Sequence, residues 1–334
     1  MAVDELGRKL GEKTVSATTE GHVEALAWSC RWAARRWALE DCRHLTRLLE
    51  SDLLAAGEMV IRVPPHLMAE SRRSGREQGK SDPIDALAVA RAALREPNLP
   101  MAKLDGDTRQ LRLLVDHRED LVGERTRMFS RLRWHLHELF PGQTIPPRAL
   151  RRFHILTDLA EQLERVDGMV AEIARELVTR CRELTTRINQ LERHIARVVR
   201  RLAPKLLELP GCGVLTAAKI IGETAGAGRF HSKAAFARWN GTAPIPVWSG
   251  NTDHFRLNRG GNRQVNAALH VIALTQVRDG DRGQGYVAGR MAAGDTRKEA
   301  IRLLRRRLSD EVFRRLLVDE AASNSNSDGQ RSAA

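Results

Sequence analysis

The chain has 334 residues, 42% of them hydrophobic and 29% charged, which is typical of a globular protein with material for two or three domains. Its 55 lysine and arginine residues against 42 aspartate and glutamate give a net charge of +13, which favours a polyanionic partner, most simply nucleic acid. A generally basic, arginine-rich proteome would give the same excess, so composition does not separate the two explanations.

Cysteine usage and hydropathy predict a cytosolic protein without a membrane span. Cys30, Cys42, Cys181 and Cys212 are scattered and form no Cys-x-x-Cys pair, which argues against a zinc module and a disulfide framework. The N-terminus lacks an apolar signal segment. The longest uncharged run, residues 264–277, is shorter than the ~20 residues that cross a bilayer.

Residues 1–100 alternate between strand-like and helix-like segments. A β-α-β-α-β order implies a sheet with helical crossovers, in which ligands collect at the carboxyl ends of the strands. Glu40 stands at the end of one expected strand, with Asp41 just after it. The expected strands are residues 13–17, 36–40 and 58–63, and the expected helices are residues 19–34 and 43–56.

Residues 80–85 (KSDPID) open a helix that brings two carboxylates to one face. Pro83 favours a helix start, so Asp82 lies at or next to the N-cap and Asp85 lies one turn later. Two such carboxylates beside Lys80 could bind a divalent cation of the Mg²⁺ class, provided that other segments add oxygen ligands. A well-capped helix has the same pattern, and these residues alone favour the cap.

Residues 101–203 predict two long helices in an antiparallel coiled coil. Apolar side chains recur at helical spacing from Thr108 to Phe140, and prolines between residues 141 and 147 interrupt the pattern. A second stripe runs from Val170 to Leu202, mostly at spacings of three and four, with arginine and glutamate between. A long hairpin cannot bury this stripe alone, so we expect a homodimer or tetramer, or tight intramolecular packing.

Residues 204–320 predict a compact, mostly α-helical domain that starts with a turn like that of a helix-hairpin-helix element. In this turn, Leu209-Pro210-Gly211-Cys212-Gly213, the two glycines leave backbone N–H groups free to approach a phosphate. An ordinary helix–helix turn has the same sequence, and the stretch alone favours neither interpretation.

A small-residue turn and a basic loop follow. Ser249 ends an extended segment at a Ser-Gly turn that could present a hydroxyl to a phosphodiester, although such a turn is usually only a turn. Residues 321–334 are rich in serine and asparagine and are expected to be disordered. The residues of the basic loop that could contact nucleic acid are Arg256, Arg259, Asn262 and Arg263.

In this order, the motifs resemble those of bacterial insertion-sequence transposases with a RuvC-like (RNase H-like) DEDD domain, a coiled-coil insertion and a C-terminal transposase domain of helix-hairpin-helix character. The resemblance covers roughly residues 1–318. Each motif is modest, but seven in the same order and spacing are specific. They are Ala38-Leu39-Glu40, Gly57 with residues 60–65, residues 80–86, residues 209–213, residues 236–244, Ser249-Gly250, and residues 259–262.

The resemblance implies an α/β plus α architecture and a DNA transposase or recombinase activity. It implies that Glu40, Asp82 and Asp85 are three of four acidic ligands of Mg²⁺ or Mn²⁺, and that Ser249 is the nucleophile on DNA. The implied domains are a RuvC-like domain at 1–100, a coiled-coil region at 101–203, a transposase domain at 204–320 and a tail at 321–334.

The resemblance also implies partners and a location. It implies binding to the DNA of element ends and targets, a guide or bridge RNA, and a multimer in which domains of different subunits assemble one active site. The location implied is the bacterial cytoplasm, in association with the nucleoid. The nucleic-acid contacts implied are Lys80, Gly211, Gly213, Arg256, Arg259, Asn262 and Arg263.

One departure concerns the first acidic ligand. The first Asp of the family lies on the first strand, whereas the early Asp4 lies in a stretch that looks like the turn after that strand, with Gly7 as a second turn residue. We therefore expect the first strand and its Asp to be missing, through a misplaced start codon or a 5′ truncation. Metal-dependent strand transfer by this chain is then expected to be weak or absent.

Two other functions stay open on the sequence. A RuvC-like junction nuclease that uses water as the nucleophile would need the three acids but not Ser249. A non-catalytic, basic coiled-coil protein would only bind nucleic acid, with Asp82 and Asp85 as helix caps. Tyrosine recombination is disfavoured, because Tyr286 is the only tyrosine and lies in a glycine-rich stretch.

Overall fold

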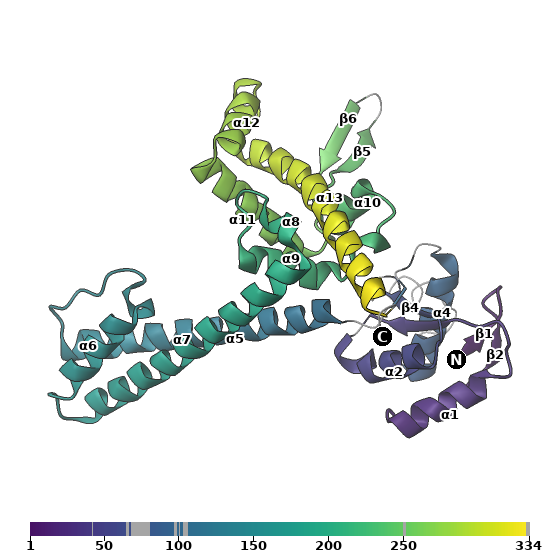
Figure 1. Ribbon diagram of the computed structural model, residues 1–334, viewed down its shortest axis with the longest axis horizontal. Helices are drawn as coiled ribbons and strands as arrows, with labels where there is room; N and C mark the ends of the chain where they lie inside the picture. The colour runs from purple at the N-terminus through teal and green to yellow at the C-terminus, as the bar shows by residue number, and fades with distance from the viewer. Residues whose placement is uncertain are drawn as a thin grey trace. The chain divides into compact units, whose positions relative to one another are not determined.

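The computed structural model describes residues 1–41, 43–64, 67, 81–96, 99, 101–102, 106–249 and 252–331, with the backbone alone at 43–44, 248–249, 252–254, 281 and 324–331. The chain forms two compact units, Met1–Asp105 and Gly106–Ala334. Helices dominate, and each sheet of the described residues has two strands (Figure 1). Every helix within these residues is too short or too polar to cross a membrane.

The first unit starts with a β-hairpin. Strands β1 (Ala2–Val3) and β2 (Lys9–Gly11) pair antiparallel, and the turn between them is the one expected around Asp4 and Gly7. Asp4 Oδ1 accepts hydrogen bonds from two backbone N–H groups of the turn, and Gly7 has a φ of 76°. The carboxylate of Asp4 therefore stabilises the turn.

The strand expected at residues 13–17 is wrong. These residues lie in a loop, and the strand of this region is β2. Helix α1 (Thr19–Ser29) follows, and the Thr18 side chain caps it by accepting from Gly21 N–H at 3.3 Å. The hydroxyl of Thr18 thus caps the helix start, and the residues before it do not form a strand.

Next comes a parallel β-α-β unit, as the sequence predicts. Strands β3 (Trp37–Glu40) and β4 (Val60–Val63) pair in register from Trp37 with Val60 to Glu40 with Val63. Helix α2 (Arg43–Ala55) connects them, and helix α4 (Asp82–Arg95) packs on both strands. The apolar side of α4 is narrow and made of small residues, namely Ala88, Val89, Ala92 and Ala93.

The second unit starts with two long antiparallel helices, α5 (Asp107–Leu139) and α7 (Met169–Leu202). Two ion pairs join the helices, Arg118 with Glu192 and Arg180 with Glu124. The short helix α6 (Phe153–Leu163) packs on α7 near the tip of the hairpin. The buried stripe of α7 comprises Leu177, Leu184, Ile188, Leu191, Ile195 and Val199.

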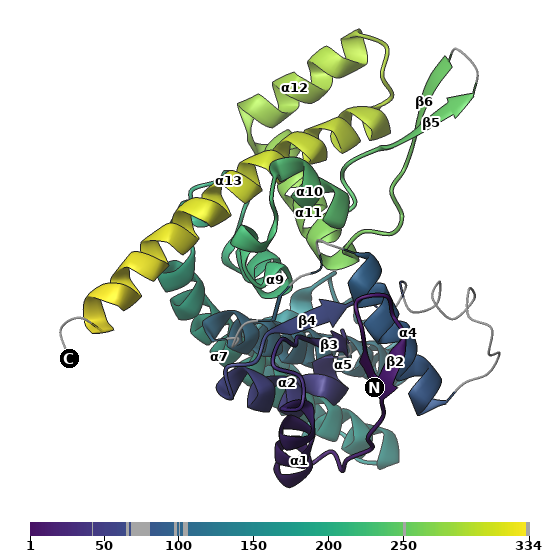
Figure 2. The ribbon, with the colours of Figure 1, turned by 90° about the vertical axis from the view of Figure 1, so that its right-hand side faces the viewer.

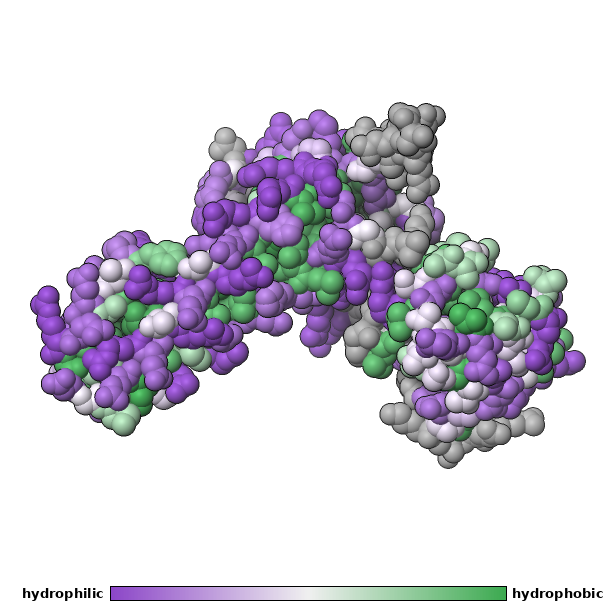
Figure 3. All heavy atoms as spheres, turned by 60° about the horizontal axis from the view of Figure 1, so that its bottom comes forward, coloured by the Kyte–Doolittle hydropathy of each residue, from purple (hydrophilic) through white to green (hydrophobic). Residues whose placement is uncertain are grey.

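This stripe is buried within the chain itself. The tight intramolecular packing expected as one alternative is therefore present, and the outer surface of the hairpin is largely hydrophilic (Figure 3). Supercoiling of the helix pair and a multimer formed through it stay predictions.

The C-terminal part of this unit is a cluster of helices around one apolar core (Figure 2). Phe236 stacks on Phe313 at the centre, with ring centroids 5.3 Å apart. An antiparallel hairpin, β5 (Ile245–Ser249) with β6 (Thr252–Arg256), leaves the cluster. The helices are α8 (Pro204–Leu207), α9 (Val214–Thr224), α10 (Lys233–Trp239), α11 (Arg263–Asp279), α12 (Asp281–Ala292) and α13 (Arg297–Arg331).

Helix α13 runs into the segment that composition predicts to be disordered. Its backbone is helical to Arg331, beyond the start of residues 321–334. A helix satisfies its own backbone groups. The turn just before this segment is also anchored, because Asp319 accepts hydrogen bonds from the first N–H groups of α8.

Candidate functional site

Glu40 is the last residue of β3 and stands at the carboxyl end of the parallel strand pair. Asp41 N–H extends the ladder by donating to Val63 O at 2.9 Å. The neighbouring strand is held by a buried ion pair, in which the Arg62 guanidinium donates to both carboxylate oxygens of Glu50 at 2.7 Å. Packing and the ladder therefore fix the strand end that carries Glu40.

The other two predicted ligands lie in the first turn of α4. Ser81 is the N-cap residue, but its side chain makes no cap hydrogen bond. Asp82 and Asp85 therefore supply the negative charge at this helix start, with Asp82 exposed and Asp85 half-buried. This geometry agrees with helix capping and leaves the carboxylate of Asp82 in reach of solvent ions, whereas Oδ1 of Asp85 is buried.

A hollow of about 800 Å³ lies between β3 and the part of α4 that follows its acidic first turn. Its lining includes Glu40 from the end of β3 and Ala86, which follows Asp85 in α4. The remaining wall is largely apolar and comes from the β1–β2 hairpin, the end of α1 with the segment that leads to β3, the strands β3 and β4, and the inner side of α4. Among the described residues, the lining includes neither Asp82 nor Asp85, so the hollow brings Glu40 beside α4 but not beside the acidic first turn of that helix.

The donor chemistry of this region fits a hard divalent cation. Mg²⁺ is usually bound by one or two carboxylates together with substrate phosphates and water, so the acidic pair with Glu40 has suitable ligands. In the part of the chain that the structure describes, no three His, Cys, Asp or Glu side chains are grouped as in a metal site. Asp4 serves its turn, and the predicted contact Lys80 lies outside the described residues.

Ser249 lies at the tip of the β5–β6 hairpin. Its backbone pairs with that of Thr252, so the two residues flank the turn. The structure describes only the backbone of Ser249, and Gly250 lies outside the described residues. The extended segment predicted from the sequence corresponds to β5, whereas β6 was not predicted. The signal for β6 was the polar turn, which precedes five residues that end at Arg256.

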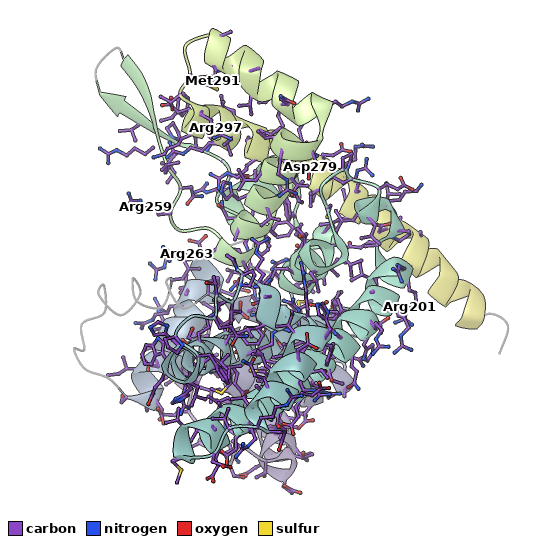
Figure 4. The ribbon with its side chains drawn as sticks, turned by 90° about the vertical axis from the view of Figure 1, so that its left-hand side faces the viewer. Arg201, Arg259, Arg263, Asp279, Met291 and Arg297 are labelled. Carbon is purple, nitrogen blue, oxygen red and sulfur yellow. The ribbon has the colours of Figure 1, made fainter. Side chains whose placement is uncertain are left out.

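The predicted basic loop presents three exposed arginines. Arg256 ends β6, Arg259 lies in the following segment, and Arg263 is the first residue of α11 (Figure 4). Among the described residues, no carboxylate lies within ion-pair distance of any of them. A cluster of cations without internal partners favours contact with a polyanion.

Asn262 has a structural role in the same loop. Its Oδ1 accepts from Val265 N–H at 2.9 Å and caps α11, while its Nδ2 donates to Glu223 Oε2 at 2.7 Å. Glu223 is buried in α9 and also lies 3.5 Å from the Arg112 guanidinium. The role of Glu223 in placing this loop could not be read from the sequence, because its partners are far away along the chain.

The two glycines of the predicted hairpin differ. Gly211 has a φ of 81°, and a Cβ there would meet Ile272 O at 3.0 Å, so the turn requires this glycine. Gly213 precedes α9, is exposed, and has nothing within 4 Å of a built Cβ. Packing therefore explains why position 211 is a glycine, and of the two glycines only Gly213 leaves space for a phosphate.

Two sequence families match separate parts of this chain. The DEDD transposase family of the IS110 type matches residues 1–141, and the IS116/IS110/IS902 transposase family matches residues 203–288. The chain carries the transposase domains of the IS110/IS116/IS902 family. The first match contains the acidic region, and the second contains the hairpin glycines and the basic loop.

Related insertion elements carry similar proteins. The chain is 25% identical over 335 residues to the uncharacterised 42 kDa protein of IS900 from Mycobacterium paratuberculosis, covering 85% of this chain and 83% of that protein. It is 33% identical over 99 residues to the uncharacterised 44.8 kDa protein of IS116 from Streptomyces clavuligerus. The chain aligns with about a quarter of that IS116 protein, since the match covers 25% of its length.

Proposed function

We propose that this chain binds DNA and catalyses DNA strand exchange in the transposition of an insertion sequence. The observation that carries the proposal is the match of residues 1–141 to a DEDD transposase domain, in which Glu40 ends β3 and Asp82 and Asp85 open α4, a helix that packs on both strands of the β3–β4 pair. A strand end and a helix start that both carry carboxylates suit metal-assisted phosphoryl transfer.

In this proposal Glu40, Asp82 and Asp85 hold Mg²⁺ or Mn²⁺. A bound ion of this kind polarises a phosphodiester and stabilises the charge that develops on its oxygens. The Ser249 hydroxyl attacks phosphorus and forms a serine–phosphate ester, while the bond between phosphorus and the leaving DNA oxygen breaks. The serine proton passes to solvent, and the leaving oxygen takes a proton from solvent. The phosphoester bond is then conserved in a protein–DNA link, so strand exchange needs no high-energy cofactor.

The proposal extends to the partners. The exposed Arg256, Arg259 and Arg263 contact DNA, and a guide or bridge RNA selects the target. A multimer brings the acidic region of one subunit to Ser249 of another.

The test combines metal binding with strand exchange. Mn²⁺ should raise the melting temperature of the wild-type chain, and the increase should be lost in Asp82→Asn and Asp85→Asn. Strand exchange on element-end DNA, where the wild-type chain supports it, should fall by at least ~10²-fold in both variants, because charge stabilisation by the ion is lost. Asp107→Asn is the matched control, since Asp107 is a first-turn acid of α5 that pairs with Arg201.

The outcomes separate the alternatives. Unchanged metal response and unchanged exchange in the Asp82 and Asp85 variants would leave both residues as helix caps and refute the proposed site. Cleavage that persists in Ser249→Ala while requiring the acids would indicate a nuclease that uses water.

A further inference from the structure

A row of three arginines on α7 lies outside the regions described so far. Arg193, Arg197 and Arg200 are spaced by four and three residues, so they share one face of the helix. All three are exposed, whereas Ile195 and Val199, between them in sequence, are fully buried on the opposite face. The row therefore lies on the outer side of the helical hairpin.

These arginines differ from three others of the hairpin that have an acidic partner. Arg118 pairs with Glu192, Arg180 with Glu124 and Arg201 with Asp107. Within the described residues, none of the three arginines of the row comes within ion-pair distance of a carboxylate, and Arg193 Nε donates only to the Asn189 carbonyl at 3.3 Å. Like charges three and four residues apart repel each other, and a bound polyanion would remove this repulsion.

The row forms one wall of an open groove of about 1060 Å³. The other wall is Val214 and Leu215 at the start of α9, directly after the open Gly213. One carboxylate, that of Glu192, also lines the groove, and it is already engaged by Arg118, whose Nε lies 2.9 Å from it. The groove is thus positively charged and joins the turn that the sequence predicts to approach a phosphate.

The shape and lining favour duplex over single-stranded nucleic acid. Single strands are usually held by bases that stack on aromatic side chains, and the lining of this groove contains no aromatic residue. The row spans about 10 Å along the helix axis, at 1.5 Å per residue, which corresponds to about three phosphates along one strand.

We propose that Arg193, Arg197 and Arg200 bind the phosphate backbone of duplex DNA. This inference rests on the proposed function, because it adds a DNA contact to the same enzyme. It places duplex DNA along the base of the helical hairpin, beside the Gly211–Gly213 turn, and separate from the basic loop at Arg256–Arg263.

The experiment compares two triple variants of the full chain that remove the same charge. Arg193→Gln/Arg197→Gln/Arg200→Gln removes the row. Arg118→Gln/Arg180→Gln/Arg201→Gln removes three arginines of the same hairpin that are paired with carboxylates. Binding of a 30-base-pair duplex is followed by fluorescence anisotropy over a series of salt concentrations, and circular dichroism checks that both variants are folded.

We expect the row variant to bind the duplex at least ~10-fold more weakly than the wild type at moderate salt. The slope of log K against log salt should fall by about 2–3, close to 0.9 for each lost phosphate contact. The control variant should change the slope by less than about 1. Equal losses in the two variants, or no loss in the row variant, would overturn the proposal.

A second arm uses a single-stranded RNA of the same length. Loss of RNA binding with intact duplex binding in the row variant would also overturn the proposal. If the chain shows no strand exchange but its duplex binding depends on the row, the DNA-binding surface is supported and the proposed function is refuted. The surface and the function can therefore fail separately.

Discussion

At the scale of single residues, burial makes two thiols inert. Cys181 lies in the stripe of α7, and Cys212 lies in the turn before α9; both are buried and free. Burial raises the pKa of Cys181 to about 11 and the pKa of Cys212 to about 12. Since the thiolate is the reactive form, neither side chain is suited to metal binding or redox chemistry near neutral pH.

Alkylation of the native protein should therefore distinguish the cysteines. In a Cys42→Ser background at pH 8, iodoacetamide should label the exposed Cys30 quickly and should label Cys181 and Cys212 only after denaturation. Mass spectrometry of tryptic peptides gives the three labelled fractions. Rapid native labelling of Cys212 would show that the turn before α9 opens readily.

At the scale of elements, the start of α11 depends on the close approach of two backbone segments. A Cβ at Gly261 would lie 2.2 Å from Gly241 N, a distance that no side chain can adopt without moving the backbone. The neighbouring Gly260 has only the Asn258 side chain near its Cβ position, at 3.6 Å. The Gly-Gly pair of the basic loop thus contains one glycine required by packing and one that is not.

This difference predicts opposite outcomes for two conservative substitutions. Gly261→Ala should lower the free energy of unfolding by about 1–3 kcal/mol, because the overpacked site must displace backbone. Gly260→Ala should have an effect within about 0.5 kcal/mol. Urea denaturation of both variants measures the difference, and equal stabilities would contradict the backbone contact between residues 241 and 261.

At the scale of the whole Gly106–Ala334 unit, α13 ties distant parts of the chain together. Asp319 Oδ1 and Oδ2 accept from Lys205 N–H and Leu206 N–H at 2.9 and 3.0 Å, and so satisfy the start of α8. The next residue, Glu320, accepts from Ala227 N–H and Gly228 N–H. The last well-packed turn of α13 therefore holds two segments that flank α9.

Removing one of these acceptors should destabilise the unit. Asp319→Asn keeps the shape but offers one oxygen for two N–H donors, so we expect a loss of about 1–2 kcal/mol. Asp310→Asn is the control on the same helix, because it removes only a surface pair with Arg306 and should cost about 0.5 kcal/mol or less. Thermal unfolding followed by circular dichroism compares them, and a larger effect at Asp310 would contradict this assignment.

The local features of the chain could be predicted from sequence. The long helices α5 and α7, the strands β3 and β4 and the helix that starts at Asp82 agree with the periodicity and the start signals of their own residues. The strand expected at residues 13–17 is wrong, because these residues form the loop between β2 and the Thr18 cap of α1. Threonine and serine occur both at helix caps and in strands, and the sequence alone does not show whether their side chains bond to a helix start.

By itself, the sequence determined the resemblance to the family, because the order and spacing of motifs can be read along the chain. The roles of Glu40, Asp82, Asp85 and Ser249 are predictions from that resemblance. Tertiary structure alone decided what individual polar groups do. It engaged Asn262 with Glu223, paired Arg201 with Asp107, and left the Arg193 row without a carboxylate among the described residues. An ion pair or hydrogen bond requires two groups within a few ångströms, and that distance is set by packing between segments far apart in the chain.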